Sequence, residues 1–119
     1  GLAPFRSMLL AAGAASAGSR PPTTLLFGCR TEEDILWRDE LEALARSGQI
    51  RLEVTLSRPG PGWRGRTGYV QQHVPELAPA LGAPHVYICG LNRMVSAVRQ
   101  VCKQELGYPR TKIHSERYD

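Results

Sequence analysis

The chain has 119 residues, of which 42% are hydrophobic and 22% charged, as expected for one globular domain with its own core but not for two. Its net charge of +4 is spread along the sequence, which argues against a nucleic-acid-binding surface and suits a smaller anionic ligand such as a nucleotide. Three cysteines without a C-x-x-C pair argue against a disulfide framework, a zinc site and an iron–sulfur cluster, so we expect no metal and a cytoplasmic setting.

The first predicted element is a helix over residues 4–17, with Pro4 in its first turn and Gly18 at its end. It contains the longest apolar run, residues 8–15, which is much shorter than the roughly 18 residues of a membrane-spanning helix. Arg6 is the only cation near this run, so we expect a helix here and not a signal peptide.

Strands and helices alternate through the middle of the chain. The apolar residues 23–28 predict a buried strand. Residues 32–46 begin with acidic side chains and end just before Gly48, which predicts a helix. Residues 50–56 alternate between apolar and polar side chains, which predicts a strand at the edge of a sheet.

The same alternation continues to the carboxyl terminus. Residues 58–67 are rich in Pro and Gly and predict a loop, and residues 68–81 are loosely helical. A third apolar strand is expected over 85–90, a helix over 92–106 and a last short strand over 111–114. This order predicts an α/β fold with a parallel sheet, in which ligands bind at the carboxyl ends of the strands.

Three glycines, Gly1, Gly28 and Gly90, lie at strand-to-helix turns of this predicted sheet. Each alone could be only a turn glycine, but three at one face of a sheet favour a close approach of the backbone to a ligand. Cys89, beside the last of them, ends a buried strand, where a cysteine is most often a small apolar residue.

Ser57 and Arg58 follow the alternating strand. They are either a simple polar exit from that strand or a binding pair for a 2′-phosphate, which a hydroxyl donor beside a planar cation suits. Tyr69 either packs under the preceding loop or offers its ring to an adenine.

Five sequence blocks resemble the ferredoxin–NADP reductase superfamily, which includes the diflavin reductases and bacterial oxygenase reductases. They follow the order and the spacing of that family over almost the whole chain. Singly each block is weak, but five in register are a specific signal. The blocks are residues 1–7 (similar to the end of G-x-G-x-A-P-F-R-S), 27–30 with 36–41 (F-G-C-R … Y-R-E-E-L), 57–58 with 68–71 (S-R … Y-V-Q), 86–90 with Met94 (Y-x-C-G-x-x-x-M), and 113–118 (E-x-F or E-x-Y).

The resemblance implies a parallel five-stranded Rossmann-like sheet of order 3-2-1-4-5, whose first strand lies upstream of this chain. Strands two to five are then the strands predicted above, and we expect a one-strand gap between residues 23–28 and 85–89. Residues 1–119 would be an NAD(P)-binding domain that is incomplete at its amino terminus. The family binds FAD in a separate β-barrel through an R-x-Y-S/T motif, which is not found in this sequence.

The resemblance also implies the roles of individual residues. Gly1 and the helix after it would hold the pyrophosphate, Arg30 would lie near the pyrophosphate or a ribose, and Ser57–Arg58 would bind the 2′-phosphate. The expected cofactor-binding residues are Gly1, Ala3, Pro4, Gly28, Cys29, Arg30, Ser57, Arg58, Tyr69, Gln71, Cys89, Gly90 and Met94. Three residues are expected beside the reacting rings and are assigned as catalytic: Cys89, Glu116 and Tyr118.

The function implied by the resemblance is that of an oxidoreductase domain. It would bind NAD(P)H and position the nicotinamide for hydride transfer to FAD, which would supply an iron–sulfur protein such as ferredoxin, a flavodoxin or a haem protein. Ser57–Arg58 favours NADP because NADH enzymes usually place an acid there, whereas the insertion between Arg58 and Tyr69 is similar to bacterial members, some of which prefer NADH. Leu91 replaces the family's proline after C-G.

Two other functions remain as alternatives. The first is a regulatory module in which the same fold binds NADP without catalysis. The second is a basic RNA-binding α/β domain, which would require the positive charge to be clustered on one face.

Overall fold

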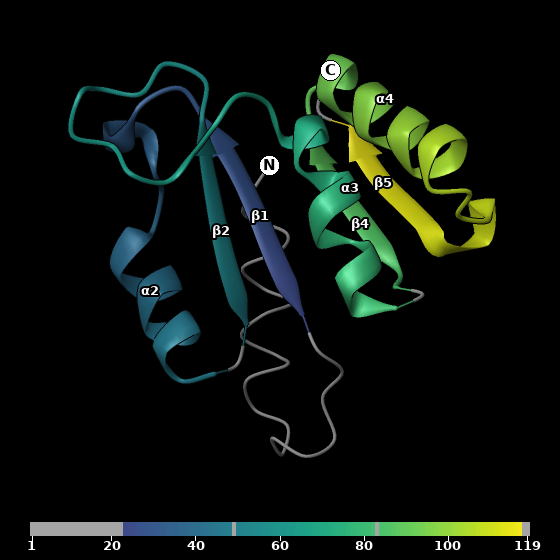
Figure 1. The fold of residues 1–119 in the computed structure, drawn as a ribbon, viewed down its shortest axis with the longest axis horizontal. Coiled ribbons are helices and arrows are strands. Elements are labelled where there is room, and N and C mark those ends of the chain that lie inside the picture. Colours follow the sequence, from purple (N-terminus) through teal and green to yellow (C-terminus); the bar gives the residue numbers. More distant parts are fainter. Residues whose placement is uncertain (1–22, 49, 83, 118–119) are drawn as a thin grey trace. The chain divides into compact units, whose positions relative to one another are not determined.

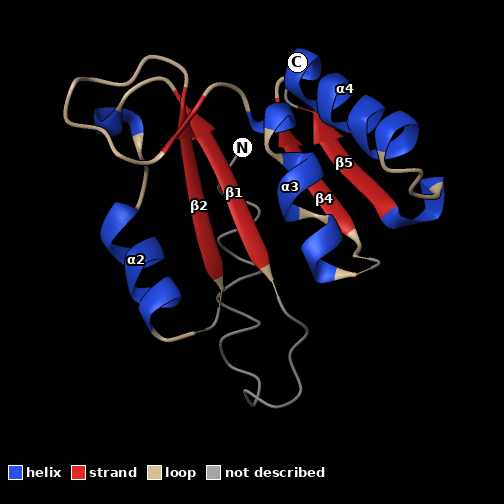
Figure 2. Ribbon diagram, viewed as in Figure 1, coloured by secondary structure: helices blue, strands red, loops and turns tan. Residues whose placement is uncertain are grey.

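The structure, a computed structural model, describes residues 23–48, 50–82 and 84–117. Its described residues form two compact units, an amino-terminal unit up to Tyr69 and a carboxy-terminal unit from Val70 onward. Both units contain parallel strands accompanied by helices, which confirms the predicted α/β class (Figure 2). No helix in these described ranges is both long and apolar enough to cross a membrane. The helix predicted over residues 4–17 lies outside them.

The amino-terminal unit is built on a three-stranded parallel sheet. Strand β1 (Thr24–Cys29) pairs with β2 (Arg51–Leu56) over its whole length, as predicted (Figure 1). A two-residue strand, β3 (Arg66–Thr67), pairs in parallel with the last two residues of β2. The prediction of a loop over 58–67 is therefore wrong for its last two residues. Within the described residues, β2 is an edge strand only before Thr55.

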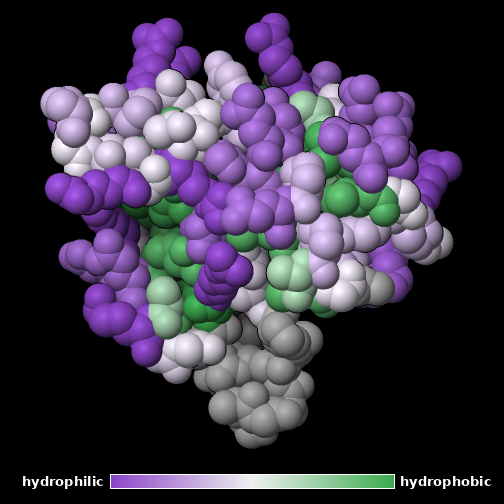
Figure 3. Space-filling model, viewed as in Figure 1, coloured by the Kyte–Doolittle hydropathy of each residue, from purple (hydrophilic) through white to green (hydrophobic). Residues whose placement is uncertain are grey.

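The two faces of this sheet differ in chemistry because neighbouring residues of a strand point to opposite faces. Leu52, Val54 and Leu56 share one face, against which helix α2 (Arg38–Arg46) packs. Glu53 and Thr55 point to the other face. In the space-filling view, apolar residues are visible between the polar side chains of α2 and those that lie over the two long strands (Figure 3).

The helix predicted over residues 32–46 is interrupted. A short 3-10 helix, η2 (Glu32–Asp34), comes first, and α2 begins only at Arg38. Between them Trp37 has a φ of 51°, in the left-handed region that a continuous helix cannot contain. The carboxylate of Asp34 accepts hydrogen bonds from the backbone N–H and the hydroxyl of Thr31, at 3.2 Å and 2.9 Å, and so closes the first turn on itself.

The carboxy-terminal unit contains a two-stranded parallel sheet. Strand β4 (Val86–Gly90) pairs with β5 (Ile113–Arg117), as predicted, and helix α4 (Asn92–Gln100) packs against both strands. The helix continues as a π-helical turn (Val101–Glu105), so the predicted helix over 92–106 is in place but does not keep one helix type.

Short helical turns make up the rest of this unit. They are the 3-10 helix η3 (Val70–Gln72), the helix α3 (Val74–Leu77) and the 3-10 helix η4 (Pro79–Leu81), which agree with the loosely helical pattern predicted there. Another 3-10 turn, η6 (Arg110–Lys112), comes just before β5. The last strand therefore begins two residues later and ends three residues later than its predicted range, 111–114.

The predicted order of five strands, 3-2-1-4-5, is not confirmed by the described strands. Both pairings that this order requires between described strands are present, namely β1 with β2 and β4 with β5. The described strands form one sheet of three and one of two, and β1 and β4 belong to different sheets. The order of the five strands therefore stays a prediction.

Candidate functional site

The carboxyl ends of β1 and β2 bring two predicted binding segments together in the amino-terminal unit. The parallel pairing continues past both strands, because the N–H of Ser57 donates to the carbonyl of Cys29 at 3.0 Å and the N–H of Arg58 donates to that of Arg30 at 2.8 Å. Arg30 and Arg58 are both exposed. This end of the sheet therefore presents two guanidinium groups and a hydroxyl on adjacent backbone positions.

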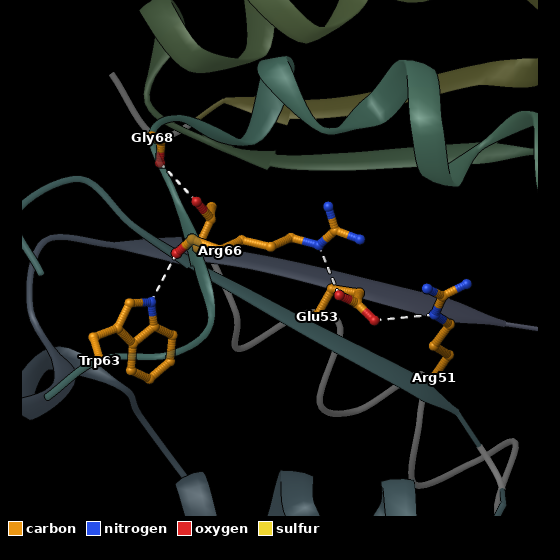
Figure 4. Close-up of polar contacts among 6 residues, drawn as sticks. Arg51, Glu53, Trp63, Arg66 and Gly68 are labelled. Carbon is orange, nitrogen blue, oxygen red and sulfur yellow. Dashed lines mark hydrogen bonds and ion pairs between the residues drawn. The ribbon is translucent and has the colours of Figure 1, made fainter.

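Tyr69 is fixed near the same strand end through the glycine before it. The N–H of Gly68 donates to the carbonyl of Leu56 at 2.9 Å, and the hydroxyl of Thr55 donates to the carbonyl of Gly68 at 2.8 Å (Figure 4). Gly68 has a φ of 96°, which strongly favours glycine, and the next residue, Tyr69, is 62% exposed. An exposed aromatic ring thus comes directly after a backbone position that is held on both sides.

Cys29, at the end of β1, is half-buried. Its thiol donates to the carbonyl of Thr31, with Sγ and O 3.4 Å apart. Burial and the neighbouring negative charge of Asp34 both raise the pKa of this thiol above its ordinary value, so it is a neutral donor at neutral pH. Cys29 therefore stabilises the turn that leads to Arg30, and Gly28 before it is exposed.

A network of polar contacts joins β2 to Trp63, in the loop that follows it, and to Arg66, the first residue of β3 (Figure 4). Glu53 accepts from Arg66 Nε at 2.7 Å and from Arg51 Nε at 3.0 Å. Burial raises the pKa of Glu53, but the hydrogen bonds and charges of the two arginines outweigh it and leave that pKa below its ordinary value. The indole N–H of Trp63 donates to the carbonyl of Arg66 at 2.8 Å.

The carboxy-terminal unit brings two of the predicted catalytic residues together. Cys89 and Glu116 are directly opposite each other in the pairing of β4 with β5. The Sγ of Cys89 lies 4.0 Å from Oε2 of Glu116, which is a long contact for a thiol donor. Cys89 is 9% exposed, whereas Glu116 is exposed. A thiol and a carboxylate are thus neighbours at the carboxyl ends of two parallel strands.

The turn after β4 is tight and closely covered. Gly90 is buried, with a φ of 157°, and the terminal methyl group of Met94 occupies the place where a Cβ on Gly90 would lie. Arg117 ties the end of β5 to the first turn of α4, because its guanidinium donates to the backbone carbonyl and the side-chain oxygen of Asn92 and to the hydroxyl of Ser96. The first turn of α4 therefore covers Gly90, and Arg117 fastens that turn to the end of β5.

A comparison with protein families identifies the family to which this chain belongs. A family model described as "Oxidoreductase NAD-binding domain" matches residues 1–100. The chain belongs to this family. Its predicted resemblance to the ferredoxin–NADP reductase superfamily is thereby confirmed.

Individual relatives of this NAD-binding domain agree with the assignment. It is 60% identical to ferredoxin–NADP reductase B of Sorangium cellulosum over 100% of this chain and 51% of the relative. It is 39% identical to NADH-cytochrome b5 reductase 1 of Aspergillus terreus over 80% of this chain and 33% of the relative. The chain therefore spans about half, or less, of the length of these relatives.

A solved structure shares the fold of the NAD-binding domain. The cytochrome b5 reductase domain of Ulva prolifera nitrate reductase superposes with a TM-score of 0.80 at 26% identity, over 98% of this chain and 46% of the other. Nearly all of this chain thus has a counterpart in an oxidoreductase of known structure.

The predicted site residues of the NAD-binding domain divide by position. The described ones lie in two groups, one at the ends of β1 and β2 and one at the ends of β4 and β5. The exceptions are Gln71, which is half-buried in η3, and Met94, which lies in the first turn of α4. Four predicted residues lie outside the described ranges: Gly1, Ala3, Pro4 and Tyr118.

The sequence interpretation missed the residues that support the site. The sequence pattern places Arg66 only in a loop, and Glu53 and Thr55 only on the polar side of an alternating strand. The alternation of charge along residues 51–53 and the arginine-rich loop after it are the available signal, but they do not specify which arginine pairs with Glu53.

Proposed function

We propose that this chain is the nucleotide-binding part of an NAD(P)H-dependent flavin reductase of the ferredoxin reductase type. The observation that carries the proposal is the grouping of Arg30, Ser57, Arg58 and Tyr69 at one end of the β1–β2 sheet. Two cations, a hydroxyl and an exposed aromatic ring are the groups that an adenosine 2′-phosphate requires.

The 2′-phosphate is the group on which the choice of cofactor depends. Ser57 and Arg58 would bind it, with Arg30 beside them at the adjoining strand end, and Tyr69 would stack on the adenine, with Gln71 beside it. NADP is therefore the expected cofactor and NAD the alternative. The names of the relatives agree with this order, since the relative at 60% identity is an NADP reductase and the one at 39% uses NADH.

The nicotinamide end is assigned to the carboxy-terminal unit. The nicotinamide would lie against the end of β4, where Gly90 leaves the backbone without a side chain, because a Cβ there would meet the methyl group of Met94. Cys89 and Glu116 would lie next to the nicotinamide and the flavin, and Tyr118 is expected with them. When bound, the flavin accepts the hydride that the reduced nicotinamide gives up.

The contribution of this chain to the reaction is orientation and electrostatics. Cys89 would hold the ring in position by contact, and its neighbour Glu116 would supply a negative charge and an acceptor at the edge of the site. Holding two reactants at a fixed separation removes the entropic cost of bringing them together, and this is the main contribution of such a domain to catalysis.

The wider setting is part of the same proposal. The residues that bind the pyrophosphate would be Gly1, Ala3 and Pro4, at the turn after a central first strand of a 3-2-1-4-5 sheet. An FAD-binding domain in the same polypeptide would complete the enzyme, and its electrons would pass to a ferredoxin, a flavodoxin or a haem protein in the cytoplasm.

The test is the substitution Arg58→Ala. If Arg58 binds the 2′-phosphate, this change weakens NADPH binding by about 2 kcal/mol, the scale of a charge-assisted contact, and leaves NADH binding nearly unchanged. The measurement is the affinity for each nucleotide by titration of the flavin-loaded polypeptide. Arg46→Ala, at the exposed carboxyl end of α2, is the matched control and should alter neither affinity. Equal losses of NADPH and NADH affinity in Arg58→Ala would show that the residue is structural.

A further inference from the structure

The segment from Trp63 to Arg66 contacts the edge of β2 on both faces of the sheet. We call these contacts of Trp63 and Arg66 the two-sided contact. Trp63 lies on the α2 face, where it lines a cavity of about 70 Å³ together with Leu41, Leu52 and Val54. Arg66 reaches the opposite face, where its Nε binds Glu53 at 2.7 Å (Figure 4). The hydrogen bond from Trp63 Nε1 to the carbonyl of Arg66 connects the contacts on the two faces.

The two-sided contact is separated from Tyr69 by only a short stretch of backbone, so it restricts where Tyr69 can lie. Arg66 and Thr67 form β3, Gly68 comes directly after them, and Tyr69 is the next residue. Thr55, which is fully buried, binds the carbonyl of Gly68 through its hydroxyl. Since Thr55 is only two residues before Ser57, the same stretch of β2 fixes both the tyrosine and the start of the Ser57–Arg58 segment.

The charge and burial of the Glu53–Arg66 pair set it apart from the ion pairs on the surface. The side chains of Glu53 and Arg66 are 20% and 19% exposed, whereas Arg51, the other partner of Glu53, is 55% exposed. A half-buried pair with a short contact holds its geometry better than an exposed one, which gains little from the interaction. Arg51 therefore provides a natural comparison with Arg66 within the same network.

We infer that Thr55 and the Glu53–Arg66 ion pair are positioning residues that fix the ring of Tyr69 relative to Ser57 and Arg58. They touch no part of the nucleotide in this assignment and act through the backbone of residues 66–68. The inference rests on the proposed function, because it takes the adenosine 2′-phosphate as the ligand of Tyr69 and Ser57–Arg58.

The reason for such devices lies in the sequence of the loop. Residues 59–62 read Pro-Gly-Pro-Gly, and a segment of this kind has little structure of its own with which to hold the residues after it. Each residue that must be ordered on binding costs about 1–2 kcal/mol of conformational entropy. Fixing Gly68 before the ligand arrives removes part of that cost, which increases affinity without adding a contact.

The first test is Thr55→Val in the flavin-loaded polypeptide, with adenosine 2′,5′-bisphosphate as the probe. Valine keeps the shape of threonine and removes its hydroxyl, and with it the hydrogen bond to the carbonyl of Gly68. Affinity for the probe should fall about fivefold, the scale of one such bond, and the KM for NADPH should rise in proportion while kcat at saturation is unchanged. Thr55→Ser restores the hydroxyl and should restore the affinity.

The second test compares Arg66→Gln with Arg51→Gln. Both substitutions remove one cation from Glu53, but only the first releases the loop, so only Arg66→Gln should weaken binding of the probe. Nicotinamide mononucleotide, which lacks the adenosine, should bind all variants like the wild type. A change in folding alone would instead affect both probes.

The outcomes separate this inference from the proposed function. If the wild type fails to bind adenosine 2′,5′-bisphosphate, both are overturned. If the wild type binds it and Thr55→Val and Arg66→Gln bind it equally well, the positioning role alone is overturned. The same holds if Arg51→Gln weakens binding as much as Arg66→Gln does.

Discussion

Leu56, the last residue of β2, should be among the most sensitive positions of the amino-terminal unit. It is 0% exposed and pairs with β1 on one side and with β3 on the other. Leu56→Ala removes three buried carbon atoms and leaves a cavity, so the free energy of unfolding should fall by about 3 kcal/mol. For a domain of this size, that loss corresponds to a fall in Tm of roughly 12 °C.

The assay is chemical unfolding monitored by tryptophan fluorescence. Both tryptophans of the sequence, Trp37 and Trp63, lie in the same unit as Leu56, so the signal reports on that unit. Leu36→Ala deletes the same atoms at a position that is 56% exposed and should cost less than about 1 kcal/mol. Similar losses for the two variants would refute the packing assigned to Leu56.

Two further predictions concern the site and its network. Cys89→Ala should slow hydride transfer to the flavin, measured by stopped-flow reduction with NADPH, much more than it weakens nucleotide binding; a regulatory module would show little change in either quantity. The pairing of Glu53 should stabilise the protein fully above the ordinary pKa of a glutamate, and this contribution should be lost as the pH falls through the lowered pKa of Glu53 in the folded state. The difference in unfolding free energy between wild type and Glu53→Gln, measured from neutral to acid pH, should accordingly shrink at the acid end.

Much of the fold could be predicted because hydrophobic patterns carry it. The apolar runs that form β1 and β4 and the alternating run that forms β2 are placed to within a few residues by the sequence, and so is the parallel class of the sheet. The interruption before α2 could not be seen, because the left-handed conformation of Trp37 has no signature in residue types. The strand β3 was missed for a related reason, since two residues after a Pro- and Gly-rich loop carry no pattern.

The candidate site was predictable only at strand ends. Ser57–Arg58 and Cys89 are candidates because ligands of parallel sheets bind at those ends, and their roles stay predictions. The pairing of Glu53 with Arg66 joins residues 13 positions apart through the path of a loop, and several arginines were equally plausible partners. Contacts of this kind depend on tertiary structure, which one sequence does not specify residue by residue.

The two-sided contact of Trp63 and Arg66 with β2 fixes the end of the loop that leads to β3, but not its tip at residues 60–62. A side chain added at Gly60 or Gly62 would meet no atom within 4 Å, so the tip lies in open space. Lengthening a loop is cheap, at about 0.6 kcal/mol for each doubling. Residues inserted between positions 60 and 62 during evolution, or a fluorophore tag placed there by design, should therefore leave the position of Tyr69 unchanged.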